Sequence, residues 1–414
     1  MRRLLNSISF RGRTVARIAL LLAVVCAASF AQETASPPDE VALADADAKF
    51  LKSFADPFLA DGFDFPVGDA NGQGKYRSTG SKVLHAWRIA ANFGENRPSG
   101  IQTGEDWDGE GDSDLGQPVY SIGNGRVIYA QEDIAPLGKT VVIEHQFLEN
   151  GKLTTVFSHY SRLQDVLVTK GQNVKRRVKI GTVGKGAGED FPAYLHFEIR
   201  KANTAALGPE FSPSAERWSE EQIRAHSEAP SPFIKARRKL THPATMPELL
   251  LAVKHRYQLH RFQNGAITKT YEIALSQSPA GHKLAEGDLR MPEGEYHIIQ
   301  KAKGPFSGPS WMKYLGAAWL RIDYPNRADA ADALSGNRIT QPVHDAIERA
   351  HRTGKMPPQD SALGGGIGVH GWKSPGWNPA GDRRITWGCI SLNEADLLKL
   401  TAETKLGTPI IIVP

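Results

Sequence analysis

The chain has 414 residues, 40% of them hydrophobic, and a formal net charge of +5. Residues 1–31 contain five arginines and no acidic residue. The whole chain has 50 Lys and Arg, so residues 32–414 contain 45 of them against 45 Asp and Glu. The neutral charge of residues 32–414 argues against nucleic acid as a partner, because proteins bind the phosphates of nucleic acids through surplus positive charge. The length is ample for two domains with separate cores.

The first 31 residues have the pattern of a secretory signal peptide. Arginines up to Arg17 precede an apolar run from Ile18 to Ala28, and small residues follow as far as Ala31. The run is too short to span a bilayer comfortably. We therefore expect cleavage and export to the periplasm or cell-wall space, with no stable membrane span after processing. An uncleaved membrane anchor is the alternative.

Residues 32–75 are interpreted as an N-terminal arm, with a short helix expected at 41–54. Between residues 76 and 201, short alternating apolar runs separated by Gly and Asn predict an antiparallel β domain. The clearest of these runs are 119–122, 126–129, 140–144 and 152–158.

Residues 202–244 contain four prolines around a polar helical stretch at 215–225, which predicts a linker with one helix. A second β-rich domain is expected over 245–414, so the predicted fold class is mainly β, with a few helices. Its expected elements are strands at 249–253, 257–262, 270–275 and 410–413, a turn at Asn264-Gly265 and a helix at 342–351. Residues 276–295 and 302–340 are expected to be long functional loops.

Cys389 is the one cysteine outside the expected signal peptide, so it has no partner for an internal disulfide. Three roles remain for the Cys389 thiol: intermolecular pairing, an inert buried position, or a reactive nucleophile. His370, upstream at the end of a Gly-rich segment, favours the nucleophile, because imidazole is the natural base for a thiol that attacks as thiolate. Gly388 permits a tight turn that exposes the sulfur and frees backbone N–H groups for an oxyanion.

These residues resemble the L,D-transpeptidase family of bacterial cell-wall enzymes. The family pattern is His-Gly, then downstream Ser/Thr-His-Gly-Cys, an aliphatic residue, and Arg or Asn. It is matched within about residues 245–414 by His370-Gly371 and by the run from Thr386 to Ser391. Trp387 replaces the second histidine of the pattern, and Ser391 replaces its Arg or Asn. The histidine that acts as base in the family corresponds to His370.

The resemblance implies a β-sandwich-like domain and a two-step acyl transfer that requires no cofactor. Cys389 would attack the carbonyl of the diamino acid in a peptidoglycan stem peptide and release the terminal D-Ala, leaving a thioester. His370 would take the thiol proton, with the Gly371 carbonyl orienting it, and N–H groups near Gly388 and Cys389 would hold the oxyanion. The positions assigned to substrate binding are Thr386, Trp387, Ser391 and Asn393.

The acceptor stays open: another stem amine, a lysine of a wall-anchored protein, or water. An L,D-carboxypeptidase or an amidase-type hydrolase with the same cysteine is the alternative within this class. The alternative from another class is a catalytically silent protein that binds peptidoglycan or regulates a partner.

Residues of about 80–201 resemble the LytM/lysostaphin-type zinc endopeptidases, whose zinc is held by the histidine of His-x-Gly-x-Asp, by its aspartate and by the last histidine of His-x-His-Phe-Glu. Asp106, His159 and His196 match the family, but Gln102 replaces the first zinc histidine and Tyr194 a catalytic histidine. A neutral amide is a poor zinc ligand, so zinc is not expected, and the domain is interpreted as an inactive module that binds peptidoglycan or activates a partner, with a purely structural scaffold as another interpretation. A working zinc peptidase, with His145 from a neighbouring strand as substitute ligand, is the alternative.

Overall fold

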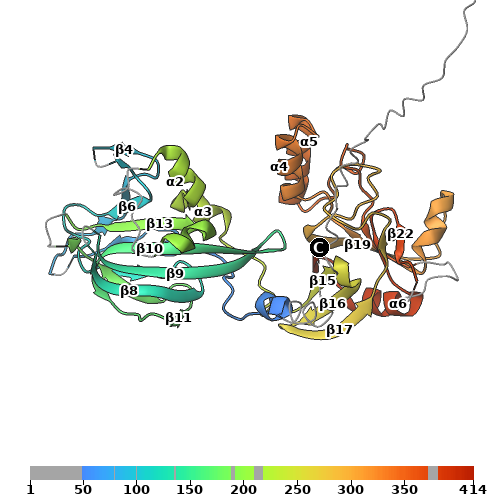
Figure 1. The fold of residues 1–414 in the computed structure, drawn as a ribbon, viewed down its shortest axis with the longest axis horizontal. Helices are drawn as coiled ribbons and strands as arrows, with labels where there is room; N and C mark the ends of the chain where they lie inside the picture. Colours follow the sequence, from blue (N-terminus) through green and yellow to red (C-terminus); the bar gives the residue numbers. More distant parts are fainter. Residues whose placement is uncertain are drawn as a thin grey trace, which may run out of the picture. The chain divides into compact units, whose positions relative to one another are not determined.

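The computed structural model describes residues 49–414 except 79, 99, 135–136, 188–191, 209–217 and 372–380. The expected signal peptide and the first part of the helix expected at 41–54 lie outside these residues, whereas 49–54 are helical. The described chain is mainly β, which confirms the predicted fold class (Figure 1). Within the described residues, no helix has the length and apolar character needed to cross a membrane.

The first domain is built on an antiparallel sheet whose main path runs β11-β8-β9-β10-β13-β6-β3, with β7, β12 and β14 attached (Figure 1). The strands are β3 (Arg88–Ala91), β6 (Glu105–Asp108), β7 (Pro118–Tyr120), β8 (Gly125–Ile134), β9 (Gly138–Glu149), β10 (Lys152–Val166), β11 (Asn173–Val174), β12 (Lys179–Val183), β13 (Leu195–Lys201) and β14 (Ser227–Glu228). Two short hairpins pair β1 (Lys75–Tyr76) with β2 (His85–Ala86) and β4 (Asn96–Arg97) with β5 (Gly100–Ile101). The four runs expected between 119 and 158 all contribute strands, as predicted.

The stretch interpreted as a linker is largely structured and contributes to the first domain's core. It holds a 3-10 helix (Ala202–Leu207), α2 (Glu220–His226) and α3 (Pro230–Ala236). Phe233 and Ile234 of α3 are buried in the same hydrophobic cluster as Phe197 and Ile199 of β13. The expected helix at 215–225 overlaps α2, but the prediction that 202–244 is a linker is wrong, because apolar residues of α3 pack into the core of the first domain.

The second domain is built on one mixed sheet of eight strands in the order β17-β16-β15-β24-β19-β20-β21-β23, with β18 and β22 paired separately. Strands β15 and β24 are parallel, as are β21 and β23. The strands are β15 (Leu249–Val253), β16 (Gln258–Gln263), β17 (Ala266–Glu272), β18 (Leu275–Ser276), β19 (Gly294–Lys303), β20 (Ala318–Ile322), β21 (Gly368–His370), β22 (Arg384–Thr386), β23 (Ile390–Ser391) and β24 (Pro409–Val413). The predicted turn joins β16 to β17, with Asn264 and Gly265 at φ angles of 49° and 82°, as a type I′ turn requires.

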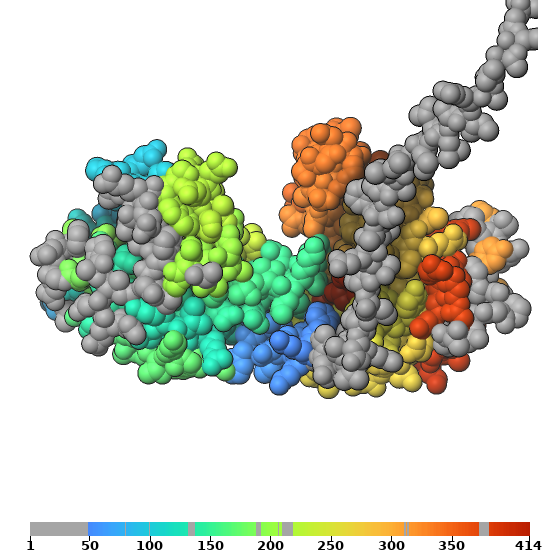
Figure 2. All heavy atoms as spheres, viewed as in Figure 1, coloured from blue at the N-terminus to red at the C-terminus, as the bar shows by residue number. Residues whose placement is uncertain are grey.

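Residues 302–340 were predicted to be a long loop, and that prediction is wrong. They contain a 3-10 helix (Ser310–Leu315), strand β20 and helix α4 (Arg327–Ser335). The short apolar run of β20 lies between glycine- and proline-rich turns, which hide it from a periodicity argument, and pairing with β19 and β21 fixes it as a strand. Helix α5 (Gln341–Arg352) is close to its expected bounds and forms with α4 a surface lobe, orange in Figure 2. Helix α6 (Glu394–Glu403) precedes the last strand.

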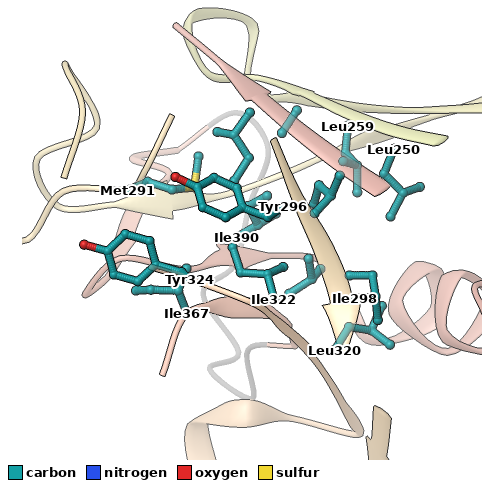
Figure 3. Close-up of a cluster of buried hydrophobic side chains, with 14 of the residues drawn as sticks. Leu250, Leu259, Met291, Tyr296, Ile298, Leu320, Ile322, Tyr324, Ile367 and Ile390 are labelled. Carbon is teal, nitrogen blue, oxygen red and sulfur yellow. The ribbon is translucent and has the colours of Figure 1, made fainter. Parts of the chain in front are cut away.

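The core of the second domain lies between the sheet and the helices and loops that cover it. Its side chains include Tyr296 and Ile298 from β19 and Leu320 and Ile322 from β20, which gather in the centre of Figure 3. Ile390, next to Cys389 in the chain, is buried in the same cluster. The strand that follows the nucleophile candidate is thereby anchored in the core.

Candidate functional site

Cys389 immediately precedes β23, and β23 runs parallel to β21 with Val369 opposite Ile390 and His370 opposite Ser391. Because opposite residues share a face, Ser391 and His370 belong to one face of the sheet, and Cys389, just before the strand, lies against the backbone that leads into β21. The thiol is partly exposed, and its Sγ lies 3.5 Å from the carbonyl oxygen of Gly366. The sequence-predicted nucleophile and base thus come from neighbouring strands.

The turn before Cys389 is held by the Thr386 hydroxyl. Its oxygen accepts a hydrogen bond from the Cys389 N–H at 3.1 Å and donates to the Cys389 carbonyl at 2.7 Å. The N–H of Gly388 also points to this oxygen, at 3.5 Å. Both N–H groups predicted to hold the oxyanion are therefore engaged by Thr386 in this conformation, which departs from the prediction.

Gly388 is required by the shape of this turn. Its φ of +148° lies in a region that side-chain-bearing residues avoid, and an added Cβ would approach Ile367 Cδ1 to 2.9 Å and the Arg290 carbonyl oxygen to 3.1 Å. The glycine therefore lets the chain place Cys389 beside β21, and its role in exposing the sulfur stays a prediction.

His370 is 5% exposed and is held from two sides. Its Nδ1 lies 2.5 Å from the Gly371 carbonyl oxygen, and its ring centroid is 5.8 Å from that of Trp319. Because a carbonyl only accepts, Nδ1 carries the proton, and a backbone hydrogen bond with Tyr314 is a further contact of the imidazole. Burial lowers the pKa of His370 to about 4, so the imidazole is neutral and able to act as a base at neutral pH.

Burial also raises the pKa of the Cys389 thiol to about 11, although Arg321 and Lys283 act in the opposite direction. A thiol with a raised pKa and an imidazole with a lowered one are both uncharged at neutral pH. The pair therefore rests as thiol and imidazole, and the thiolate forms only when the proton has an acceptor and the developing charge is stabilised.

The four residues assigned to substrate binding have different surroundings. Trp387 is 62% exposed and available to a ligand, but Thr386 is 3% exposed and Ser391 is fully buried. Asn393 caps α6, where its side chain accepts a hydrogen bond from the Asp396 N–H at 2.9 Å. Thr386 and Ser391 are buried and Asn393 is partly buried, and direct substrate contact by these three residues stays a prediction.

In the first domain, Asp106 of β6 and His196 of β13 face each other in adjacent strands. His196 Nδ1 lies 2.7 Å from an Asp106 oxygen, and its Nε2 lies 2.9 Å from a Glu198 oxygen. Burial alone would lower the pKa of His196, but these two hydrogen bonds and the nearby negative charges raise it to about 9. His196 is therefore an imidazolium with both nitrogens occupied.

The residues at this site do not fit zinc. The two nitrogens of His196 are held by the Asp106 and Glu198 carboxylates. Gln102 offers an amide in place of an imidazole, and its Nε2 is buried without a hydrogen-bond partner among the described residues. No group of three or more His, Cys, Asp or Glu with metal-site geometry occurs within the described part of the chain.

The remaining histidines of the first domain do not complete a metal site. His145 is fully buried, with Nδ1 2.8 Å from the Asn124 carbonyl oxygen and Nε2 2.7 Å from Ser158 Oγ, so the suggestion that it substitutes as a zinc ligand is wrong. His159 is also buried, and its Nδ1 lies 3.0 Å from Ser161 Oγ. Tyr194 instead carries the Arg162 guanidinium over its ring, 4.2 Å from the centroid.

Sequence reasoning missed one residue near the thiol, Arg321 of β20. Its signal was present, because Trp319 and Arg321 alternate with apolar residues in Ala318–Ile322 and so share a face of the strand. The segment was taken for a loop, and the alternation was not used.

Residues 102–209 match peptidase family M23, and residues 247–412 match the L,D-transpeptidase catalytic domain. The lipoprotein NlpD of Yersinia enterocolitica is 33% identical over 85 residues, which are 20% of this chain and 78% of the relative. The chain belongs to peptidase family M23 and carries an L,D-transpeptidase catalytic domain.

The M23 domain has further relatives. The peptidoglycan DD-endopeptidase ShyB of Vibrio cholerae is 37% identical over 89 residues, which are 22% of this chain but 19% of ShyB. A zinc-containing peptidase from Vibrio cholerae of known structure is 29% identical, with 34% of this chain and 37% of that chain covered and a TM-score of 0.24. This chain thus spans well under two thirds of the length of these two proteins.

Proposed function

We propose that this protein is a peptidoglycan L,D-transpeptidase that works through a thioester on Cys389. The observation that carries the proposal is the placement of a partly exposed thiol and a neutral imidazole at neighbouring strands. Neutral imidazole is the form that accepts a proton, and the contact of its Nδ1 with Gly371 orients the ring.

The reaction has two steps. As the sulfur of Cys389 attacks the diamino acid carbonyl, His370 takes the thiol proton; the peptide bond then breaks, and the departing D-Ala amine receives that proton. A thioester remains. An acceptor amine next attacks the thioester carbon and gives a proton to His370, and the thiol is restored. Water in place of the amine gives the L,D-carboxypeptidase alternative.

The experiment is mass spectrometry of the full chain incubated with a tetrapeptide muropeptide. We expect released D-Ala and an adduct of the protein on Cys389. A cross-linked product identifies a transferase, and a tripeptide product alone identifies the hydrolase. If the chain forms no adduct and releases no D-Ala, the catalytically silent alternative holds and this proposal is wrong.

For the M23 domain, we propose a peptidoglycan-binding role without zinc chemistry. The support is the donor set, in which His196 is fixed between Asp106 and Glu198 and Gln102 replaces a histidine. Metal analysis of the full chain dialysed against zinc should find a substoichiometric amount. The double variant Gln102→His/Tyr194→His, which rebuilds the family pattern, is the matched positive control. Stoichiometric zinc in the unaltered chain would contradict the proposal.

We further propose that the protein is exported to the periplasm or cell-wall space, where peptidoglycan stem peptides and possible protein acceptors lie. The apolar leader and two relatives named as lipoproteins, in Yersinia enterocolitica and Pseudomonas aeruginosa, support this. Cell fractionation with an antibody against the chain tests it, and a cytoplasmic signal alone would contradict it.

A further inference from the structure

The sheet face that carries His370 also carries a cation with an incomplete set of partners. Arg321 of β20 lies opposite Gly368 of β21, in the register that places Trp319 opposite His370. Opposite residues share a face, so Arg321 lies on the face of the imidazole. Its Nε is buried and has no hydrogen-bond partner among the described residues.

The contacts of the Arg321 side chain are weak ones. Its Nη1 lies 3.8 Å from the sulfur of Met356, a poor acceptor, and its guanidinium carbon lies 6.0 Å from the Trp319 ring centroid. Lys283, which also acts on the thiol, is by contrast paired with Asp288 at 2.9 Å. A half-buried guanidinium that lacks a carboxylate is costly to the folded protein, and such a group suggests a ligand that supplies one.

The space between Arg321 and the thiol contains no intervening side chain from β21, because residue 368 is a glycine. A Cβ there would approach the Leu320 carbonyl oxygen to 2.3 Å and the Trp319 ring to 2.9 Å, so the position does not accept a larger residue without movement. The positive charge of Arg321 is felt at Cys389, where it favours the thiolate. Ser391, on the same face, is neutral and buried.

We propose that Arg321 binds a carboxylate of the donor stem peptide next to the scissile bond and so positions the diamino acid carbonyl against Cys389. This inference rests on the proposed function. The planar guanidinium fork matches a carboxylate with two parallel hydrogen bonds, which fix orientation as well as position. The carboxylate comes either from the terminal D-Ala or from the side chain of the diamino acid, and the two sources are separated by experiment.

The test compares the unaltered chain with Arg321→Gln on three tetrapeptides: one with both carboxylates free, one with the terminal carboxyl amidated, and one with the diamino acid side-chain carboxyl amidated. We expect Arg321→Gln to lower kcat/KM for the free peptide about 10- to 100-fold, the range of a lost charge-assisted hydrogen bond. The loss should vanish on whichever amidated peptide lacks the bound carboxylate. Arg327→Gln, which removes an exposed arginine paired with Glu348, is the matched control and should leave kcat/KM unchanged.

Two readouts separate a carboxylate contact from an effect on the thiol. Iodoacetamide is neutral, so its rate of reaction with Cys389 reports the thiolate alone. If Arg321→Gln lowers kcat/KM on all three peptides and the iodoacetamide rate by the same factor, the proposal is wrong. Peptide affinity measured by calorimetry in the Cys389→Ala background needs no chemistry, and Arg321→Gln should weaken it for the free peptide by a similar factor. If the unaltered chain releases no D-Ala while this affinity difference persists, the proposed reaction fails but the carboxylate site stands; an unchanged affinity removes the site.

Discussion

Two histidines, one in each domain, hold opposite protonation states although both are shielded from water. His196 lies between two carboxylates, and the pKa of its imidazole rises to about 9 against the effect of burial. His370 lies against a backbone carbonyl, and burial lowers its pKa to about 4. The difference teaches that the negative charges within hydrogen-bond reach, more than burial, decide whether a family histidine remains a base. The M23 domain keeps a cation where the transpeptidase domain keeps a base.

The largest test of this comparison is turnover. His370→Ala should lower the rate of D-Ala release about 10²- to 10⁴-fold, because a positioned general base contributes that much, and Cys389→Ala should abolish the adduct. His196→Asn, which changes the histidine of the M23 domain, should leave the rate within about twofold, since no step of the proposed reaction uses it.

Circular dichroism spectra of the three variants check that the loss is chemical. A comparable loss in His196→Asn with an intact fold would break the distinction between the two sites. D-Ala release at the normal rate by His370→Ala would remove the base from the mechanism.

A second test measures the resting state of the thiol. Because burial raises the pKa of Cys389 to about 11, the thiolate fraction should rise about tenfold per pH unit between about pH 7 and 10. The rate of iodoacetamide alkylation should follow it, with Cys389→Ala giving the background. A rate that levels off near neutral pH would mean that a preformed thiolate–imidazolium pair exists, and the two histidines would then be alike in charge.

A third test measures how the protonation of each histidine changes the free energy of unfolding. The pKa of His196 is raised in the folded state. The contribution of His196 to the free energy of unfolding is therefore complete below about pH 6.5 and is lost as the pH rises through about 9. With about 1.4 kcal/mol per pKa unit, the unfolding free energy should fall by about 3 kcal/mol across this window. The effect of His370 on stability has the opposite sign. Because folding lowers the pKa of its imidazole, the free energy of unfolding should fall as the pH drops from about 6.5 to about 4.

Urea unfolding of the full chain at several pH values, with His196→Gln and His370→Gln as references, measures both effects. Each variant should remove the pH dependence in one window and leave the other. If His196→Gln leaves the alkaline slope unchanged, the imidazolium assignment is wrong.

Much of the fold was predictable because the strands alternate and their turns have strong signals. Leu249–Val253 forms a strand with the predicted bounds, and Asn264-Gly265 forms the predicted hairpin turn. Strand β20 was not predicted, since its short apolar run is stabilised by pairing with β19 and β21, contacts that a local pattern does not contain.

The site divides in the same way. Cys389 and His370 were identified from chemistry and family resemblance, and the structure brings their strands together. Thr386, Ser391 and Asn393 were assigned to the substrate because motifs mark residues without telling whether a side chain faces the ligand or supports the backbone. The state of His196 was also beyond the sequence, because it depends on Glu198 and Asp106 converging from two strands.

The finest test changes one charge at His196. Glu198→Gln replaces the carboxylate 2.9 Å from Nε2 with a neutral amide while Asp106 stays in place, so the pKa of His196 should fall below about 9. NMR titration of the His196 ring protons measures it. Glu220→Gln, at an exposed pair with Arg224, is the matched control and should leave the titration unchanged. Because Glu198 also binds Arg200, the fold of the variant is checked first. Asp106→Asn then repeats the test from the other side of the ring. If the midpoint of the His196 titration is unshifted in both variants, the two carboxylates do not hold the proton.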